Sequence, residues 1–110
     1  MAVNIWALDK HDSIRCLLLM LQQSFGAEQI RILESGCLHP KAIRIGEQGG
    51  PATAYLYTYA HEEGHYGLHL EYPYLPESNI SELEDMYEEL EYDSVVAMLQ
   101  VHFQWQLKQA

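Results

Sequence analysis

The sequence of 110 residues contains little positive charge. Lysine and arginine together number 6, against 16 aspartate and glutamate residues, which gives a formal net charge of −10. A field of this sign repels the phosphates of nucleic acids and of anionic membranes, and it attracts basic proteins. We therefore expect neither nucleic acid nor a membrane as a partner, and a basic protein is the partner that the charge favours.

Long apolar runs and a cysteine framework are also missing. The longest apolar run, residues 16–21, is far shorter than the roughly 20 residues that span a bilayer. The N-terminus has no basic stretch ahead of an apolar segment, as a signal peptide would have. The two cysteines, Cys16 and Cys37, are expected to be reduced thiols. These absences predict a cytoplasmic protein.

The acidic residues gather in the second half of the chain. Residues 1–60 hold five acids and five bases, whereas residues 61–110 hold eleven acids and one base. Residues 77–93 alone contain eight acids and no base. This run is either a solvated surface or a docking surface for a basic partner, whose association would be fast and sensitive to salt.

Hydrophobic periodicity indicates both helices and strands. Apolar residues at helical spacing predict a helix over residues 13–25, with Asp12 as its N-cap and Cys16 as a small buried side chain. Alternation of apolar and polar residues predicts four strands after it. They fall at 29–34, at 41–46 and in the two halves of 54–72.

The acidic second half is predicted to contain two helices. Residues 81–84, Ser-Glu-Leu-Glu, fit a capping box, and an apolar stripe follows them to Leu90. A second helix would begin near Asp93 and end near residue 103, with a strand over 99–107 as the alternative. The outer face of the first of these helices would carry Glu82, Asp85, Glu88 and Glu89.

The predicted element order is α-β-β-β-β-α-α. It describes a single small α+β domain over residues 1–110. In this fold an antiparallel meander sheet has its helices packed on one face.

One segment, His61-Glu62-Glu63-Gly64-His65, carries the H-E-x-x-H pattern. On a helix, two histidines one turn apart hold zinc and the glutamate acts as general base. Over these five residues the chain resembles the zincin metallopeptidases. The resemblance implies a small zinc-dependent metallohydrolase, with His61 and His65 as ligands and Glu62 as the base.

The residues around this segment favour a β-hairpin instead. Residues 52–60 alternate with a period of two, and Gly64 suits the left-handed position of a three-residue turn over 62–64. That register would place His61 opposite His65, Tyr59 opposite Gly67, and Tyr57 opposite His69. The Tyr59 ring could then cover the bare backbone of the glycine. We therefore expect a protein that is not an enzyme and that has no metal or other cofactor, and the zinc hydrolase is the alternative.

The hairpin would collect aromatic and polar side chains on one face of the sheet. Tyrosine is frequent at binding sites because it buries a large area for little loss of conformational entropy. The alternatives are that a helix covers these side chains as ordinary core, or that they form a homodimer interface. The candidate residues are Tyr55, Tyr57, Tyr59, His61, His65, His69 and Glu71.

These observations predict a small acidic interaction protein. It would bind a basic protein partner through the tyrosine-rich face and the acidic helix. In size and charge it compares with bacterial immunity proteins, antitoxins, inhibitors and secretion chaperones, which is a comparison of physical character and not of sequence.

Overall fold

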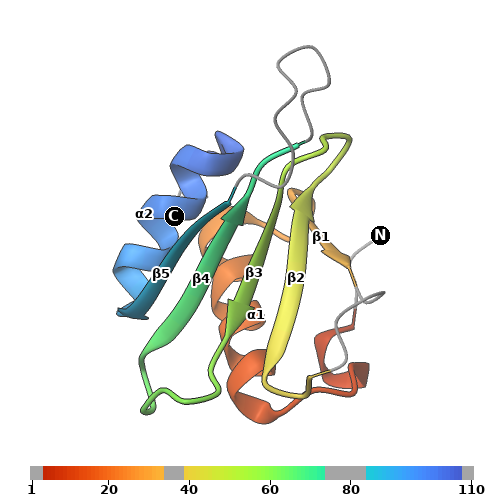
Figure 1. Ribbon diagram of the computed structural model, residues 1–110. Coiled ribbons are helices and arrows are strands. Elements are labelled where there is room, and N and C mark those ends of the chain that lie inside the picture. Colours follow the sequence, from red (N-terminus) through yellow and green to blue (C-terminus); the bar gives the residue numbers. More distant parts are fainter. Residues whose placement is uncertain (1–3, 34–38, 74–83, 108–110) are drawn as a thin grey trace.

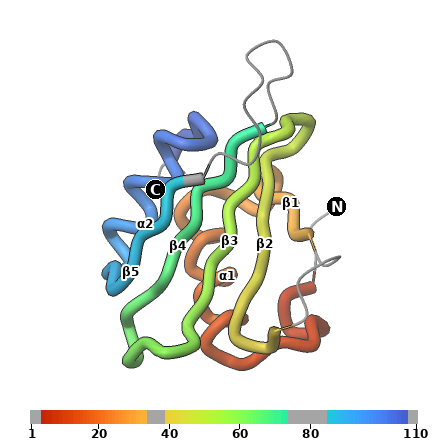
Figure 2. The backbone as a smooth tube through the Cα atoms, viewed as in Figure 1, coloured from red at the N-terminus to blue at the C-terminus, as the bar shows by residue number. Residues whose placement is uncertain are grey.

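Five antiparallel strands form one sheet, and both helices lie on the same face of it (Figure 1). The structure is a computed structural model that describes residues 4–33, 39–73 and 84–107. Strands that are consecutive in sequence are neighbours in the sheet, so the chain follows a meander (Figure 2). The predicted α+β class and antiparallel meander are confirmed. In chain order the elements are the 3-10 helix η1 (Ile5–Ala7), α1 (Asp12–Phe25), β1 (Ile30–Leu33), β2 (Ala42–Glu47), β3 (Thr53–Tyr57), β4 (Tyr66–Glu71), β5 (Glu84–Leu90) and α2 (Tyr92–Phe103).

The core lies between the two helices and one face of the sheet. The stripe of α1 that faces the sheet is at most 1% exposed, and it consists of Ile14, Leu17, Leu18, Leu21 and Phe25. Alternate strand residues and the inner side of α2 complete the core with Ile43, Ile45, Leu56, Leu68, Val95, Leu99 and Phe103. Burial of each such side chain stabilises the fold by ~1.5–3 kcal/mol, so these residues hold both helices to this face. In the described ranges no helix is both long and apolar enough to cross a bilayer.

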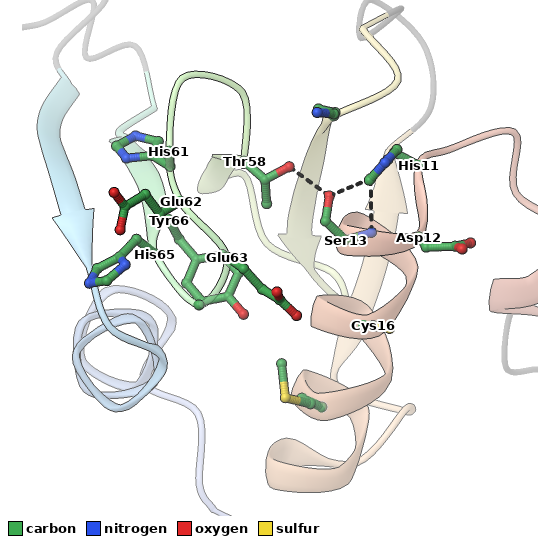
Figure 3. Close-up of a pocket in the computed structure, with 13 residues that line it drawn as sticks. His11, Asp12, Ser13, Cys16, Thr58, His61, Glu62, Glu63, His65 and Tyr66 are labelled. Carbon is green, nitrogen blue, oxygen red and sulfur yellow. Dashed lines mark hydrogen bonds between the residues drawn. The ribbon is translucent and has the colours of Figure 1, made fainter.

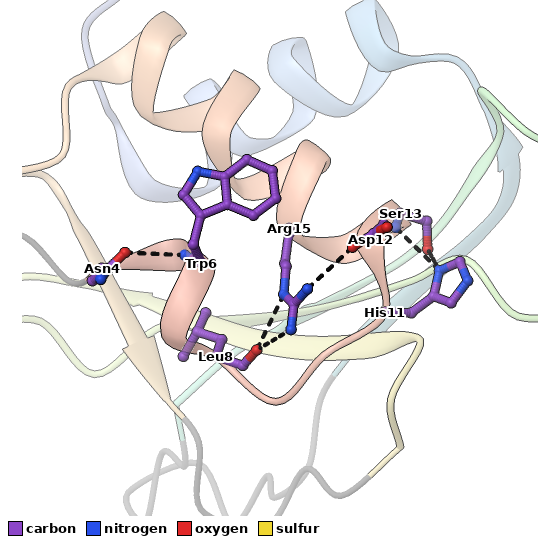
Figure 4. Close-up of polar contacts among 7 residues, drawn as sticks. All are labelled: Asn4, Trp6, Leu8, His11, Asp12, Ser13 and Arg15. Carbon is purple, nitrogen blue, oxygen red and sulfur yellow. Dashed lines mark hydrogen bonds and ion pairs between the residues drawn. The ribbon is translucent and has the colours of Figure 1, made fainter.

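The first helix is where the sequence predicts it, but its N-cap is different. The cap is His11, whose Nδ1 accepts a hydrogen bond from the Ser13 N–H at 3.1 Å (Figure 4). Asp12 is the first helical residue and pairs with Arg15 at 3.1 Å. The Arg15 guanidinium also donates to the carbonyl oxygen of Leu8 at 2.8 and 3.1 Å. These bonds tie the segment that follows η1 to the first turn of α1.

The predicted acidic helix is wrong, because Glu84–Leu90 forms β5 at an edge of the sheet. The free edge of β4 presents backbone groups that need partners, and pairing with them outweighs local helix propensity. In this pairing Leu90 lies opposite Tyr66. The start of the predicted helix, Glu82 included, lies within residues 74–83, outside the described residues. The order is therefore α-β-β-β-β-β-α after η1, and α2 confirms the last predicted helix.

β5 contains a bulge at its C-terminal end. Its register with β4 shifts by one residue between the pairs formed by Tyr66 and Leu68, so that Glu88 and Glu89 both lie opposite Gly67. The backbone accommodates the extra residue at Glu89, which adopts a positive φ of 56°. A bulge turns side chains away from strict alternation, and here it brings two consecutive carboxylates to one place.

The β3–β4 register differs from the prediction by two residues. Tyr57 lies opposite Gly67 and Tyr55 opposite His69, so the connection spans residues 58–65 instead of three residues. Two successive turns form it: the His61 N–H donates to the Thr58 carbonyl at 3.2 Å, and the N–H of His65 donates to Glu62 at 3.0 Å. A shift of two residues leaves every side chain on its predicted face.

Gly67 allows the Tyr57 side chain to lie directly on β4. A Cβ atom built on Gly67 would overlap the Tyr57 ring. The sequence suggests that a tyrosine ring covers this glycine, and the two-residue shift makes that ring Tyr57 and not Tyr59. Glycine at position 67 is thus required for close approach, not for an unusual backbone angle.

We predict that Gly67→Ala destabilises the fold by ~1–3 kcal/mol, because the new methyl group must displace the Tyr57 ring. The free energy of unfolding in urea measures this cost. The matched control is the same substitution in a Tyr57→Ala background, where the cost should disappear because the ring is gone. Equal costs in the two backgrounds would show that the ring contact does not require the glycine.

Candidate functional site

The face of the sheet opposite the helices carries the predicted tyrosines. Leu56 and Leu68 point toward the helices, so their strand neighbours Tyr55, Tyr57 and His69 point to the other side. We call this other side the open face. Both α1 and α2 pack on the opposite face, so within residues 4–33, 39–73 and 84–107 the predicted alternative, in which a helix covers the tyrosines as core, is wrong.

Five rings on the open face pack into one cluster, which we call the aromatic row: Tyr55, Tyr57, Tyr59, His61 and His69. Tyr57 is at its centre and stacks on Tyr59, with ring centroids 4.4 Å apart and planes at 20°. The other three rings lie 5.4–5.6 Å from Tyr57, and His69 meets it edge-on. Tyr57 is only 4% exposed, although neither of the helices in the described part of the chain covers it. The row is a packed, ordered surface and not a set of independent side chains.

One end of the row is closed by an ion pair. The Arg44 guanidinium donates to both carboxylate oxygens of Glu71, at 2.9 and 3.2 Å, and lies 5.2 Å from the Tyr55 ring centroid. The Thr53 hydroxyl also donates to Glu71, at 2.9 Å. Glu71 is a predicted binding residue, and here its charge is already neutralised within the protein.

The opposite end of the row meets the carboxylates of the β5 bulge. The Tyr57 hydroxyl donates a short hydrogen bond to Glu88 across β4. His61 Nε2 lies 2.6 Å from a Glu88 oxygen, and Nδ1 lies 3.1 Å from a Glu89 oxygen, within ion-pair distance but outside hydrogen-bond direction. The His61 side chain is 3% exposed, whereas Glu88 and Glu89 are 59% and 64% exposed. Both carboxylates are thus anchored to the row and open to solvent.

The Tyr57–Glu88 contact is polarised toward a neutral phenol and an anionic carboxylate. Burial, followed by the hydrogen bond to Glu88, raises the pKa of Tyr57. The hydrogen bond from Tyr57 has the largest effect and lowers the pKa of Glu88; burial, the next largest, opposes it, and the hydrogen bond with His61 lowers this pKa further. At neutral pH this end of the row therefore presents negative charge beside aromatic rings.

The remaining acidic candidates do not join this surface. Asp85 lies opposite Leu70, on the helix side of the sheet, and accepts a hydrogen bond from the Tyr72 hydroxyl at 2.8 Å. That bond is the main cause of the raised pKa of Tyr72. A helix would have placed Asp85 on one face with Glu88 and Glu89, and the strand separates them. Glu82 lies outside the described residues.

The H-E-x-x-H segment does not form the helix that a zincin site needs. Its residues lie in the β3–β4 connection, and neither histidine is opposite the other because the strands end at Tyr57 and Tyr66. Both ring nitrogens of His61 lie within ion-pair distance of carboxylates of β5. Within the described residues no group of three or more histidine, cysteine or acidic side chains is arranged to hold a metal ion.

A cavity of about 570 Å³ lies between the start of α1 and the β3–β4 connection (Figure 3). Cys16, predicted to be buried, is exposed on α1 and lines it together with His65. The side-chain hydrogen bonds between residues that line the cavity belong to the helix cap: Ser13 Oγ lies 2.9 Å from His11 Nδ1 and 2.7 Å from Thr58 Oγ1. Because Nδ1 also accepts the Ser13 N–H, these groups serve to start the helix.

Sequence reasoning missed several residues of the open face. Arg44 closes one end of the row, and the His39 ring lies 4.6 Å from that of Tyr59. Met86 of β5 lies opposite His69 and is 62% exposed. The alternation of β2 places Arg44 on the tyrosine side once β2 is paired with β3. The strand order was therefore the information needed to predict that Arg44 belongs to the open face.

The fold and this surface together define a small antiparallel α+β protein with an aromatic and anionic open face. Comparisons of the chain with protein-family models, with curated proteins and with solved structures find no match. The interpretation of the surface therefore comes from its own geometry and charge.

We predict that Tyr57→Phe raises the pKa of Glu88 toward the ordinary value of about 4.3, because the substitution removes the donor that lowers it most. The pH dependence of the side-chain carboxyl shifts in carbon-detected NMR measures this. Tyr59→Phe is the matched control, since Tyr59 is a ring of the row whose hydroxyl does not bond Glu88. An unchanged Glu88 pKa in Tyr57→Phe would contradict the contact.

Tyr57 should also make stability sensitive to alkaline pH. Because its pKa is raised, the folded protein holds this proton more tightly than the unfolded chain. The resulting stabilisation is fully present below about pH 10, the ordinary pKa of tyrosine, and is lost as the pH rises further. We expect the difference in free energy of unfolding between wild type and Tyr57→Phe to shrink above that pH. A difference that is independent of pH would be inconsistent with a buried, neutral Tyr57.

Proposed function

We propose that this protein is a non-enzymatic interaction protein that binds a basic protein partner through its open face. One observation carries the proposal: the aromatic row ends on two exposed carboxylates, Glu88 and Glu89, that are held in place by Tyr57 and His61. The sequence contains no lysine or arginine between Arg44 and Lys108 that could neutralise them. Because both carboxylates keep more than half of their surface exposed, a basic partner can supply positive charge to this end of the row.

The chemistry of the row suits recognition of arginine and lysine. Aromatic faces attract cations, and a carboxylate beside them can accept a charge-assisted hydrogen bond from the same group. The row is also ordered before binding, because its rings pack on one another and on Gly67. Preorganisation reduces the entropy lost on association, so a modest contact area can give useful affinity.

The kind of partner follows from the charge of the whole molecule. A net charge of −10 would steer a basic protein toward the surface and make association fast and salt-sensitive. Small acidic proteins that mask a basic surface include immunity proteins, antitoxins, inhibitors and chaperones, and we place the function in this group. A reducing compartment such as the cytoplasm suits the free, exposed thiol of Cys16.

The two alternatives receive less support. A homodimer formed through the open face would bring the Glu88 and Glu89 carboxylates of an already anionic chain toward a second copy. A zinc hydrolase would need residues 61–65 on a helix, and they form turns. We therefore propose neither.

We expect an affinity column of the wild-type protein to retain a basic protein at low salt and to release it at high salt. The retained protein is then identified, purified and titrated by calorimetry. Glu88→Gln with Glu89→Gln should weaken its binding by about tenfold or more, because charge-assisted contacts contribute ~1.5–3 kcal/mol each.

The matched control carries the same change of charge elsewhere, as Asp9→Asn with Glu28→Gln, two exposed residues of the N-terminal half. It should bind the purified partner nearly as well as the wild type. The proposal fails if the partner is not basic, if its affinity does not depend on salt, or if both double variants bind alike.

A further inference from the structure

We propose that the partner binds as an extended segment that adds a strand to the free edge of β5. Its basic side chains would lie over the open face, and its apolar side chains would enter a groove between β5 and α2. This inference rests on the proposed function and specifies the form of the partner.

β5 is the longer of the two edge strands of this sheet. Among the described residues it pairs with β4 alone, and it has seven residues where β1, at the opposite edge, has four. The outward backbone groups of an edge strand remain available to a new strand. Because the bulge at Glu88 and Glu89 interrupts regular pairing, the segment suited to addition is 84–87.

An apolar groove runs along the helix side of this edge. Its volume is about 460 Å³, and Tyr72, Tyr87, Met98 and Val101 are among the side chains that line it. Val101 is 79% exposed, and Tyr72 and Tyr87 are 40% and 36% exposed. These three, together with Met86 on the other side of β5, account for four of the six exposed large hydrophobic side chains of the described residues. Exposed apolar side chains gathered in this way mark a contact surface.

The two sides of β5 differ in chemistry, and this difference predicts a sequence pattern in the partner. Successive side chains of an added strand point to opposite faces of the sheet. Those on the open face would lie beside Met86 and the anionic Glu88, and those on the other face would lie beside Tyr87 and Val101 and beside Asp85, which accepts a hydrogen bond from the Tyr72 hydroxyl. The partner strand should therefore alternate basic and apolar residues.

A second copy of this chain does not fit the same edge. Two β5 strands paired with each other would place the acidic side chains Asp85, Glu88 and Glu89 of both copies in one small region. Like charges at close cross-strand positions are destabilising. The acidic edge therefore opposes self-pairing while it favours a basic strand.

The probe is a synthetic heptapeptide of alternating lysine and valine, added to isotope-labelled protein and followed by NMR. We expect shift changes at the β5 amides and at Val101, and slower exchange of the outward β5 amides with solvent. Val101→Ser should weaken peptide binding by about tenfold, because a buried apolar contact is lost. Leu107→Ser, at an exposed apolar residue outside the groove, is the matched control.

Two N-methylated forms of the peptide test whether backbone hydrogen bonds are made. Methyl groups on alternate nitrogens block one edge of the peptide and leave the other intact. Whichever edge faces β5, one form should bind about tenfold more weakly than the other, since each lost hydrogen bond costs ~0.5–1.5 kcal/mol.

Equal binding by both methylated forms would overturn strand addition, since simple ionic attraction does not depend on backbone donors. Absence of peptide binding would overturn it as well. So would a dimer of the protein alone, seen by sedimentation, that is formed through β5. None of these results bears on the proposed function, which is decided by the purified basic partner and the Glu88→Gln with Glu89→Gln variant.

Discussion

The passage of the Tyr57 side chain over Gly67 organises the open face. Tyr57 starts on β3, its ring lies on the bare backbone of β4, and its hydroxyl reaches Glu88 on β5. One side chain thus spans three strands. It provides the ring on which Tyr59 stacks, and it fixes the carboxylate at the edge of the sheet. With any other residue at position 67 the Tyr57 ring would be displaced away from β4, and the other rings of the aromatic row would lose the ring on which they pack.

The two ends of the open face differ in electrostatic character. At one end Arg44 neutralises Glu71 and covers Tyr55, so this end is closed and complete. At the other end two carboxylates converge on His61 and keep most of their surface in solvent. The bulge in β5 produces this convergence, because two consecutive residues lie opposite a single residue of β4. The structural irregularity and the candidate binding site therefore have the same origin.

The periodicity of the sequence was sufficient to predict on which face of the sheet each side chain lies. It was insufficient to predict which residues pair across neighbouring strands. The alternation from Ala54 to Tyr59 places the tyrosines on one side, and any even shift of register preserves that assignment. The length of the β3–β4 connection depends on turns at Thr58 and Glu62, which carry no strong signal in the sequence. The register, and with it the partner of Gly67, was therefore not predictable.

The acidic segment was misassigned for a related reason. Its apolar residues Met86, Tyr87 and Leu90 fit a helical stripe, and glutamate favours helices, so local information points to a helix. The edge of β4 offers a tertiary partner that local propensity does not include. As a consequence Asp85 was grouped with Glu88, although the strand places them on opposite sides of the sheet.

The position of the Tyr57 ring on Gly67 is the central claim of this account, and proton NMR tests it directly. The account predicts nuclear Overhauser contacts from the Tyr57 ring protons to the Gly67 Hα atoms and to the Glu88 side chain. It also predicts Gly67 Hα resonances displaced upfield by the ring current. Unshifted Gly67 Hα resonances without these contacts would contradict it.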